Sequence, residues 1–180
     1  LYRGRDIIHE VRPANWSVTD SNCVRVKWSG SLMRGRGRRV DWSGTIHTDV
    51  ARIQSATEVS FDASSDGVTE IRPHAVKFRS LTTGDADGLD LILDNARRGR
   101  LIFDTPVCKH EVDLTTLTNG LHAVDCGGLD MQLEIQRYPM CNETLELDLT
   151  ATTVSKGAYF VKAIQSDGHL AWSSPIYIDY

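Results

Sequence analysis

Apolar and polar side chains alternate with a period of two residues along much of this chain. Val24, Val26 and Trp28 alternate with Arg25 and Lys27, a pattern that puts the apolar side chains on one face of a half-buried β-strand. The same alternation runs through 89–94, 131–136 and 145–150, and further candidates are 38–47, 52–61, 74–81, 100–104, 107–114, 158–165 and 174–180. The pattern predicts about ten or eleven short strands.

Turn residues separate these strands. Glycine follows a polar or charged residue at Asp66-Gly67, Thr83-Gly84, Arg98-Gly99, Asn119-Gly120, Lys156-Gly157 and Asp167-Gly168, and such pairs are typical of tight turns. No apolar stripe of helical period runs over a length typical of helices. The sequence therefore predicts an all-β fold with little helix. An antiparallel sandwich and a barrel both fit this pattern, and the sandwich is the prediction.

The length allows one domain with a core of its own. A chain of 180 residues, 41% hydrophobic and 24% charged, buries roughly two-thirds of its unfolded surface. No linker divides it, so a single domain over 1–180 is predicted. No apolar run is long enough for a transmembrane helix, and Arg3, Arg5 and Glu10 stand where a signal peptide needs apolar residues. Because the chain begins at Leu1, we expect a processed protein or a fragment of a longer one.

One short motif occurs twice. The segment 27–32, Lys-Trp-Ser-Gly-Ser-Leu, is echoed fourteen residues later by 41–46, Asp-Trp-Ser-Gly-Thr-Ile. This distance is too short for a blade or a solenoid repeat. We interpret the two segments as neighbouring strands of one sheet, with Trp28 and Trp42 packed side by side.

The cysteines do not form a metal-binding motif. Cys23, Cys108, Cys126 and Cys141 include no C-x-x-C pair, so a cysteine metal site is not expected. An even number permits two disulfides in an oxidising compartment, while buried thiols fit equally well. We interpret them as free thiols. The compartment stays open, with the cytoplasm favoured.

Positive charge is concentrated in an arginine-rich segment. Arg34 and Arg36 lie in it with Arg38 and Arg39, and guanidinium clusters can hold phosphate groups. The chain as a whole is acidic, with a net charge of −4 and a pI near 5.8, whereas nucleic-acid-binding domains are usually basic. We therefore expect no nucleic-acid partner. Arg34 and Arg36 are kept as candidate ligand-binding residues, with a solvated strand rim or a contact with an acidic surface as the favoured interpretation.

Two acidic loops raise the hypothesis of a calcium site. Oxygen-bearing side chains alternate before a glycine in 62–67 and 83–88, an arrangement that lets a tight turn aim several oxygens at one hard cation. The candidate ligands are Asp62, Asp66, Asp85, Asp87 and Asp90. Neither loop completes the twelve-residue calcium pattern, and Asp-Gly is equally typical of a hairpin turn. No cofactor is required, and calcium is the one candidate.

No motif for catalysis is present. The six histidines include no H-x-H or H-E-x-x-H spacing, and no nucleophile elbow or phosphate-binding loop occurs. Trp16 and Trp172 offer an alternative kind of site, because exposed aromatic rings can stack on sugar rings. Trp28 lies on an apolar strand face and is assigned to the core.

The segment 161–178, which contains Asp167-Gly168, Ala171-Trp172-Ser173-Ser174-Pro175 and Ile176, resembles the closing hairpin of bacterial proteins related to the PHP (polymerase and histidinol phosphatase) metallohydrolases. The segments 88–94 and 125–130 are also similar to that type of module. The resemblance implies a β-sandwich accessory module. It also implies that the metal-binding residues of the family, beginning with an H-x-H motif, belong to a separate catalytic domain, so no catalytic residue is carried over.

The leading hypothesis is therefore a non-catalytic β-sandwich that packs against a neighbouring metallohydrolase-like domain or a partner protein. By this hypothesis the isolated chain is not an enzyme, although the full-length protein can be a metal-dependent hydrolase. The alternative is a carbohydrate-binding module, assisted by calcium. A third hypothesis, a free-standing enzyme, requires that folding bring histidines and carboxylates together. No membrane partner is expected.

Overall fold

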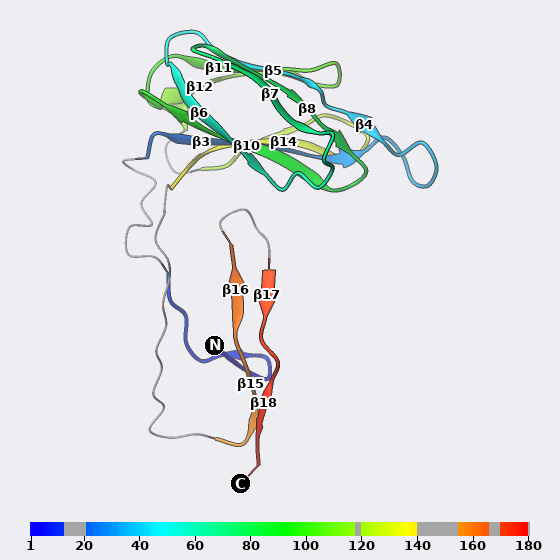
Figure 1. Cartoon of the computed structure of the whole chain (residues 1–180), viewed down its shortest axis with the longest axis vertical. Helices are drawn as coiled ribbons and strands as arrows, with labels where there is room; N and C mark the ends of the chain where they lie inside the picture. The colour runs from blue at the N-terminus through cyan, green and yellow to red at the C-terminus, as the bar shows by residue number, and fades with distance from the viewer. Residues whose placement is uncertain (13–20, 118–119, 140–154, 166–169, 180) are drawn as a thin grey trace. The chain divides into compact units, whose positions relative to one another are not determined.

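The chain is built almost entirely of β-strands. The computed structural model describes residues 1–12, 21–117, 120–139, 155–165 and 170–179. These residues form eighteen strands and one 3₁₀ turn, Leu114–Thr116, and every strand pairing among them is antiparallel. The predicted all-β antiparallel sandwich fold is confirmed (Figure 1). No helix in these ranges is long and apolar enough to span a membrane.

The contacts divide the chain into two compact units. The large unit is Ser17–Met140, and the small unit combines Leu1–Trp16 with Cys141–Tyr180. The sequence predicted one sandwich domain over 1–180, and in the described residues both five-stranded sheets belong to the large unit. Sequence alternation could not reveal this division, because strands of both units carry the same period-two pattern.

The large unit contains two five-stranded sheets, which Figure 1 shows as two layers of the same unit. The first, called here the β3 sheet, has the order β13 (His122–Asp125), β14 (Leu129–Tyr138), β3 (Cys23–Ser31), β10 (Ala86–Leu93) and β6 (Ile53–Val59). The second, called the β5 sheet, has the order β12 (Lys109–Asp113), β11 (Arg100–Asp104), β5 (Gly44–Thr48), β8 (Ala75–Arg79) and β7 (Gly67–Arg72). The short strands β4 (Val40–Asp41) and β9 (Leu81–Thr82) pair where the chain passes between the sheets.

Aromatic rings fill the space between the sheets. Trp28 from the β3 sheet is fully buried, and its ring stacks on Phe78 at 4.5 Å between centroids and lies 5.5 Å from Phe103. Both phenylalanines come from the β5 sheet. Phe61 meets the same indole edge-on at 6.1 Å. Aromatic pairs of this kind each contribute about 0.5–1.5 kcal/mol beyond the area that they bury, so this cluster holds the two layers together.

The outer face of β3 carries a buried ion pair. The Arg25 guanidinium donates two hydrogen bonds of 2.7 Å to the carboxylate of Asp90 on the neighbouring strand β10, and it lies 3.4 Å from the ring centroid of Tyr138 on β14. Arg25 is only 6% exposed. The polar positions of this strand are therefore not all solvated, because a central strand has neighbours on both sides that cover its outer face.

The repeated tryptophan motif does not form neighbouring strands, so this interpretation was wrong. Trp28 lies on β3, whereas Trp42 lies between β4 and β5 and belongs to the opposite layer. Both rings contact Phe103. The Trp28 indole N–H donates to Ser80 Oγ and that of Trp42 to Thr82 Oγ1. The two copies thus face each other across the core, because the chain changes sheets after β3.

The described residues of the small unit include no fully buried side chain. One sheet has the order β18 (Ile176–Ile178), β15 (Gly157–Phe160), β1 (Tyr2–Arg3) and β2 (Asp6–Ile7), and a separate hairpin joins β16 (Lys162–Ile164) to β17 (Leu170–Trp172). Tyr2 stacks on Phe160 at 5.1 Å. The predicted strands over 158–165 and 174–180 are found here in shorter form, and the predicted strand in 145–150 lies outside the described residues.

Glycine at position 30 is required by both backbone and space. Gly30 has a φ of +104°, and a Cβ there would lie 2.5 Å from Asp130 O and Met131 Cα. Gly35 also has a positive φ, +84°, but faces open space. We expect Gly30→Ala to lower the free energy of unfolding by about 3 kcal/mol or more, from strain plus overlap, and Gly35→Ala by about 1 kcal/mol, from strain alone.

Urea denaturation of both variants measures this difference. Equal losses at the two positions would contradict the close packing of β3 against the bulge at 130–131 of β14.

Candidate functional site

The tryptophans separate into core and surface positions. Trp28 and Trp42 are completely buried, which confirms the core assignment of Trp28. Trp172, on β17 of the small unit, is 58% exposed, and the Lys162 ammonium lies 5.8 Å from its ring centroid. Trp16 lies outside the described residues. One of the two predicted sugar-stacking side chains therefore presents a free aromatic surface.

The arginine candidates lie on an exposed connection. Arg34 and Arg36 belong to the segment between β3 and β4, and both are exposed. Arg100, which lies near Arg97 and Arg98 in the sequence, is instead on β11, where it pairs with Asp49 at 2.9 Å and Glu111 at 2.7 Å. The charge of Arg100 is thus balanced by two carboxylates.

Three of the predicted acidic ligands come together at one end of the sandwich. Asp62, Asp85 and Asp87 each place one carboxylate oxygen within 4.8 Å of the others. Within the described part of the chain, they are the only group of three or more His, Cys, Asp or Glu side chains that could hold a metal ion. We call them the three-aspartate cluster. Asp62 and Asp85 are exposed or partly exposed, whereas Asp87 is 2% exposed.

Asp87 is the buried end of a hydrogen-bonded chain. The Trp28 indole N–H donates to Ser80 Oγ at 2.8 Å, and the Ser80 hydroxyl donates to Asp87 Oδ2 at 2.6 Å. Burial raises the pKa of Asp87 to about 6, the hydrogen bond from Ser80 opposes this rise, and the negative charges of Asp85, Asp62 and Asp66 add to it. Asp87 Oδ1 has no hydrogen-bond partner among the described residues.

The remaining two predicted ligands have other partners. Asp66 accepts hydrogen bonds from the Ser65 hydroxyl and the Leu81 backbone N–H, both at 2.9 Å. Asp90 is held by Arg25. The period of the strand explains the separation: Asp87 lies on the core face of β10 with Leu89 and Leu91, while Asp90 lies on the outer face.

A histidine pair joins the edges of the two sheets, and sequence spacing did not predict it. His110 on β12 and His122 on β13 stack with ring centroids 4.9 Å apart, and their Nε2 atoms are 2.7 Å apart. β12 and β13 are edge strands of different sheets. Two histidines twelve residues apart meet only because these sheets pack, so no local motif signals the contact.

The described cysteines are free, and two of them have raised pKa values. Cys23, Cys108 and Cys126 are free, as predicted for these three, and Cys141 lies outside the described residues. Burial, together with the nearby Cys108, raises the pKa of Cys126 to about 12, and burial likewise raises that of Cys23 to about 12. A thiol with so high a pKa is a poor nucleophile at neutral pH.

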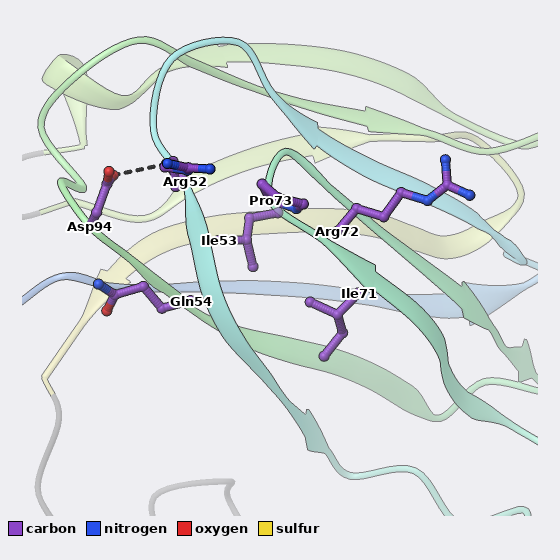
Figure 2. Close-up of a pocket in the computed structure, with 7 residues that line it drawn as sticks. All are labelled: Arg52, Ile53, Gln54, Ile71, Arg72, Pro73 and Asp94. Carbon is purple, nitrogen blue, oxygen red and sulfur yellow. Dashed lines mark hydrogen bonds between the residues drawn. The ribbon is translucent and has the colours of Figure 1, made fainter.

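A shallow hollow of about 510 Å³ lies beside the start of β6, lined by Arg52, Ile53, Gln54, Ile71, Arg72, Pro73 and Asp94 (Figure 2). Asp94 accepts a hydrogen bond from the Arg52 backbone N–H at 2.8 Å, and the Arg72 guanidinium pairs with Glu70 at 2.6 Å. Asp94 is the one carboxylate in this lining, so the hollow offers no acid and base pair for catalysis.

Comparison with known proteins adds no assignment: no family model matches the chain, and no curated protein and no solved structure matches it either. The resemblance to PHP-related proteins therefore continues to depend on the segments quoted above.

The histidine pair generates a pH prediction. A hydrogen bond between two Nε2 atoms needs one donor and one acceptor, so both rings cannot be protonated. Burial and the positive charge of His122 lower the pKa of His110, against an opposing effect of Glu111. Because the folded state binds this proton more weakly than the unfolded chain, stability is present above the unfolded pKa of about 6.5 and is lost as the pH falls below it.

We expect His110→Gln to remove this loss, which should not exceed about 1 kcal/mol because the pair is partly open to solvent. Urea denaturation at about pH 7.5 and about pH 5.5 measures it, with His47→Gln as the control. An unchanged acid sensitivity in His110→Gln would show that the pair does not cause it.

Proposed function

We propose that this chain is a non-catalytic accessory module whose small unit attaches the β-sandwich to a neighbouring protein domain. The observation that carries the proposal is the concentration of exposed apolar side chains on the small unit. It holds eight of the thirteen large hydrophobic side chains that are exposed among the described residues, although it has fewer than a third as many described residues as the large unit.

These side chains follow the strands of the small unit. They are Ile7, Ile8, Val161, Ile164, Leu170, Trp172, Ile176 and Tyr177, and the last two are 68% and 73% exposed. A two-stranded hairpin such as β16–β17 is marginally stable alone, and the exposure of large apolar side chains to water is unfavourable. A protein surface that covers β16–β18 would remove both costs.

The chemistry of this surface favours a protein partner. Its exposed members are aliphatic and aromatic. The charges of the described small unit lie mainly in 1–12, whereas residues 155–165 and 170–179 carry only Lys156, Lys162 and Asp179. The cores of protein interfaces have this composition, with aromatic residues enriched and charged residues depleted. The resemblance of 161–178 to the closing hairpin of PHP-related proteins supports a metallohydrolase-like domain as the neighbour.

Two observations support the non-catalytic part of the proposal. In the described ranges the only convergent group of potential metal ligands consists of three aspartates, and the buried thiols have raised pKa values. We expect the purified chain to give no turnover of a generic phosphoester such as p-nitrophenyl phosphate with added Mn²⁺ or Zn²⁺. Saturable turnover that copurifies with the chain would contradict the proposal.

A pair of double variants tests the apolar surface. We expect the isolated wild-type chain to bind the dye 1-anilinonaphthalene-8-sulfonate and to self-associate in sedimentation velocity, because the surface lacks its partner. Ile176→Lys/Tyr177→Lys should abolish self-association and most of the dye signal. The matched control is Ile71→Lys/Leu121→Lys, which changes two side chains of the sandwich that are 47% and 51% exposed and should behave like the wild type.

Two results would contradict this interpretation. A monomeric wild-type chain that binds no dye would mean that the small unit is covered by its own chain. Equal effects of the two double variants would mean that dye binding and self-association do not depend on the surface of the small unit.

A second candidate, a carbohydrate-binding module, has one observation in its favour. The indole of Trp172 is 58% exposed, with Lys162 beside it, and flat aromatic surfaces stack on the apolar faces of sugars. If this candidate is correct, a soluble polysaccharide should retard the wild-type chain in affinity electrophoresis, and Trp172→Ala should migrate freely. Tyr177→Ala is the control for loss of an exposed aromatic ring. No retardation across a panel of polysaccharides would exclude this function for Trp172.

A further inference from the structure

We propose that the three-aspartate cluster, Asp62, Asp85 and Asp87, binds a calcium ion. Its carboxylate oxygens lie within 4.8 Å of one another. Calcium–oxygen distances are about 2.3–2.6 Å, so one ion can touch oxygens separated by roughly twice that length. A single Ca²⁺ can therefore contact all three side chains after at most a small adjustment of their rotamers.

Strand pairing brings together the two loops that carry Asp62 and Asp85 and the start of β10, which carries Asp87. β6 and β10 are antiparallel neighbours, with Val59 opposite Gly88 at the end of the ladder. The chain that leaves β6 toward Asp62 thus runs beside the chain that enters β10 through Asp85 and Asp87. Asp85 Oδ1 also accepts the Thr83 backbone N–H at 2.5 Å, which fixes the carboxylate relative to its own turn.

Asp87 supplies the observation that points to a ligand. Its side chain is 2% exposed, and Oδ1 has no hydrogen-bond partner among the described residues. Oδ2 is already bonded to Ser80. A buried carboxylate oxygen without a partner costs free energy, and Oδ1 is the oxygen of this carboxylate that is left for a cation shared with Asp62 and Asp85.

The negative charges around the cluster also favour a bound cation. Asp66 adds a fourth carboxylate whose negative charge acts on Asp87. Arg79 is a cation in this region, and its Nε lies 4.0 Å from Asp66 Oδ1, at the limit of an ion pair. These carboxylates repel one another, and a divalent cation between three of them would convert this repulsion into attraction.

The ligand set selects the type of ion. All three side chains offer oxygen, which suits hard cations and not Zn²⁺ or Cu²⁺. The cluster combines one buried carboxylate with two on exposed loops, and Ca²⁺ tolerates such irregular geometry while Mg²⁺ requires a near-ideal octahedron at 2.0–2.1 Å. Water must complete the shell, so we expect an affinity like that of extracellular calcium modules, about 10⁻⁴–10⁻³ M.

Calcium titration of the whole chain tests the proposal. Protein dialysed against EDTA is titrated with CaCl₂ up to about 10 mM, roughly ten times the weakest of these dissociation constants. Tm is followed by circular dichroism. In parallel, Tb³⁺ is added as a luminescent substitute for Ca²⁺ and excited through tryptophan, because the Trp28 indole reaches Asp87 through two hydrogen bonds. We expect a saturable rise in Tm and a Tb³⁺ emission that Ca²⁺ displaces.

Single variants locate the site. Asp62→Asn and Asp85→Asn change exposed or partly exposed side chains and leave the Ser80–Asp87 hydrogen bond intact, so both should fold. Each should weaken Ca²⁺ binding by about tenfold or more, since calcium affinity depends on the number of charged ligands. The matched control is Asp104→Asn, which removes a carboxylate from the Lys109 ion pair on β11 and should change the affinity less than about twofold.

Three results would overturn the proposal. They are a folded wild-type chain with no saturable response to Ca²⁺, unchanged binding in both Asp62→Asn and Asp85→Asn, and an equal response to MgCl₂ at the same concentration.

Discussion

The burial of Trp28 between the two sheets is the interaction on which the large unit depends. Its ring contacts Phe78 and Phe103 of the β5 sheet and Phe61 beyond β6, so one side chain joins both layers. An indole carries an N–H that must be hydrogen-bonded when it is buried. The position of Trp28 therefore requires an acceptor inside the sandwich, and Ser80 supplies it.

This requirement explains why buried hydroxyl groups lie at the end of the core. Ser80 and Thr82 are fully buried, and they lie on the segment that leads from β8 to β10. Ser80 connects Trp28 to Asp87, and Thr82 connects Trp42 to the Gly30 carbonyl. The same residues thus satisfy both indoles, hold the crossing between the sheets, and leave one oxygen of Asp87 facing the exposed acids. The packing of Trp28 in the core and the position of the buried Asp87 carboxylate are thus linked through Ser80.

The two units differ in how they bury apolar surface. The large unit closes its core from two five-stranded sheets with aromatic side chains between them. In the described part of the small unit, eight large apolar side chains on or beside short strands are exposed, which is consistent with the proposed need for a covering surface. This difference agrees with a division of labour in which the sandwich is a self-sufficient scaffold and the small unit is the region of attachment.

The sequence by itself determined the strands, the all-β class and the acidic loops. Alternation in 24–28, 89–93 and 131–135 correctly predicted β3, β10 and β14, because apolar and polar residues alternate along a strand that is buried on one face. The aspartates at 62, 85 and 87 were recognised from their turn chemistry. Tertiary structure decided which strands share a sheet, and it put the two tryptophan motifs in opposite layers.

It also excluded Asp90 from the acidic cluster through its pairing with Arg25, and it brought His110 to His122. These contacts join residues that are distant along the chain, and local patterning specifies the face of a strand but not the partner opposite it.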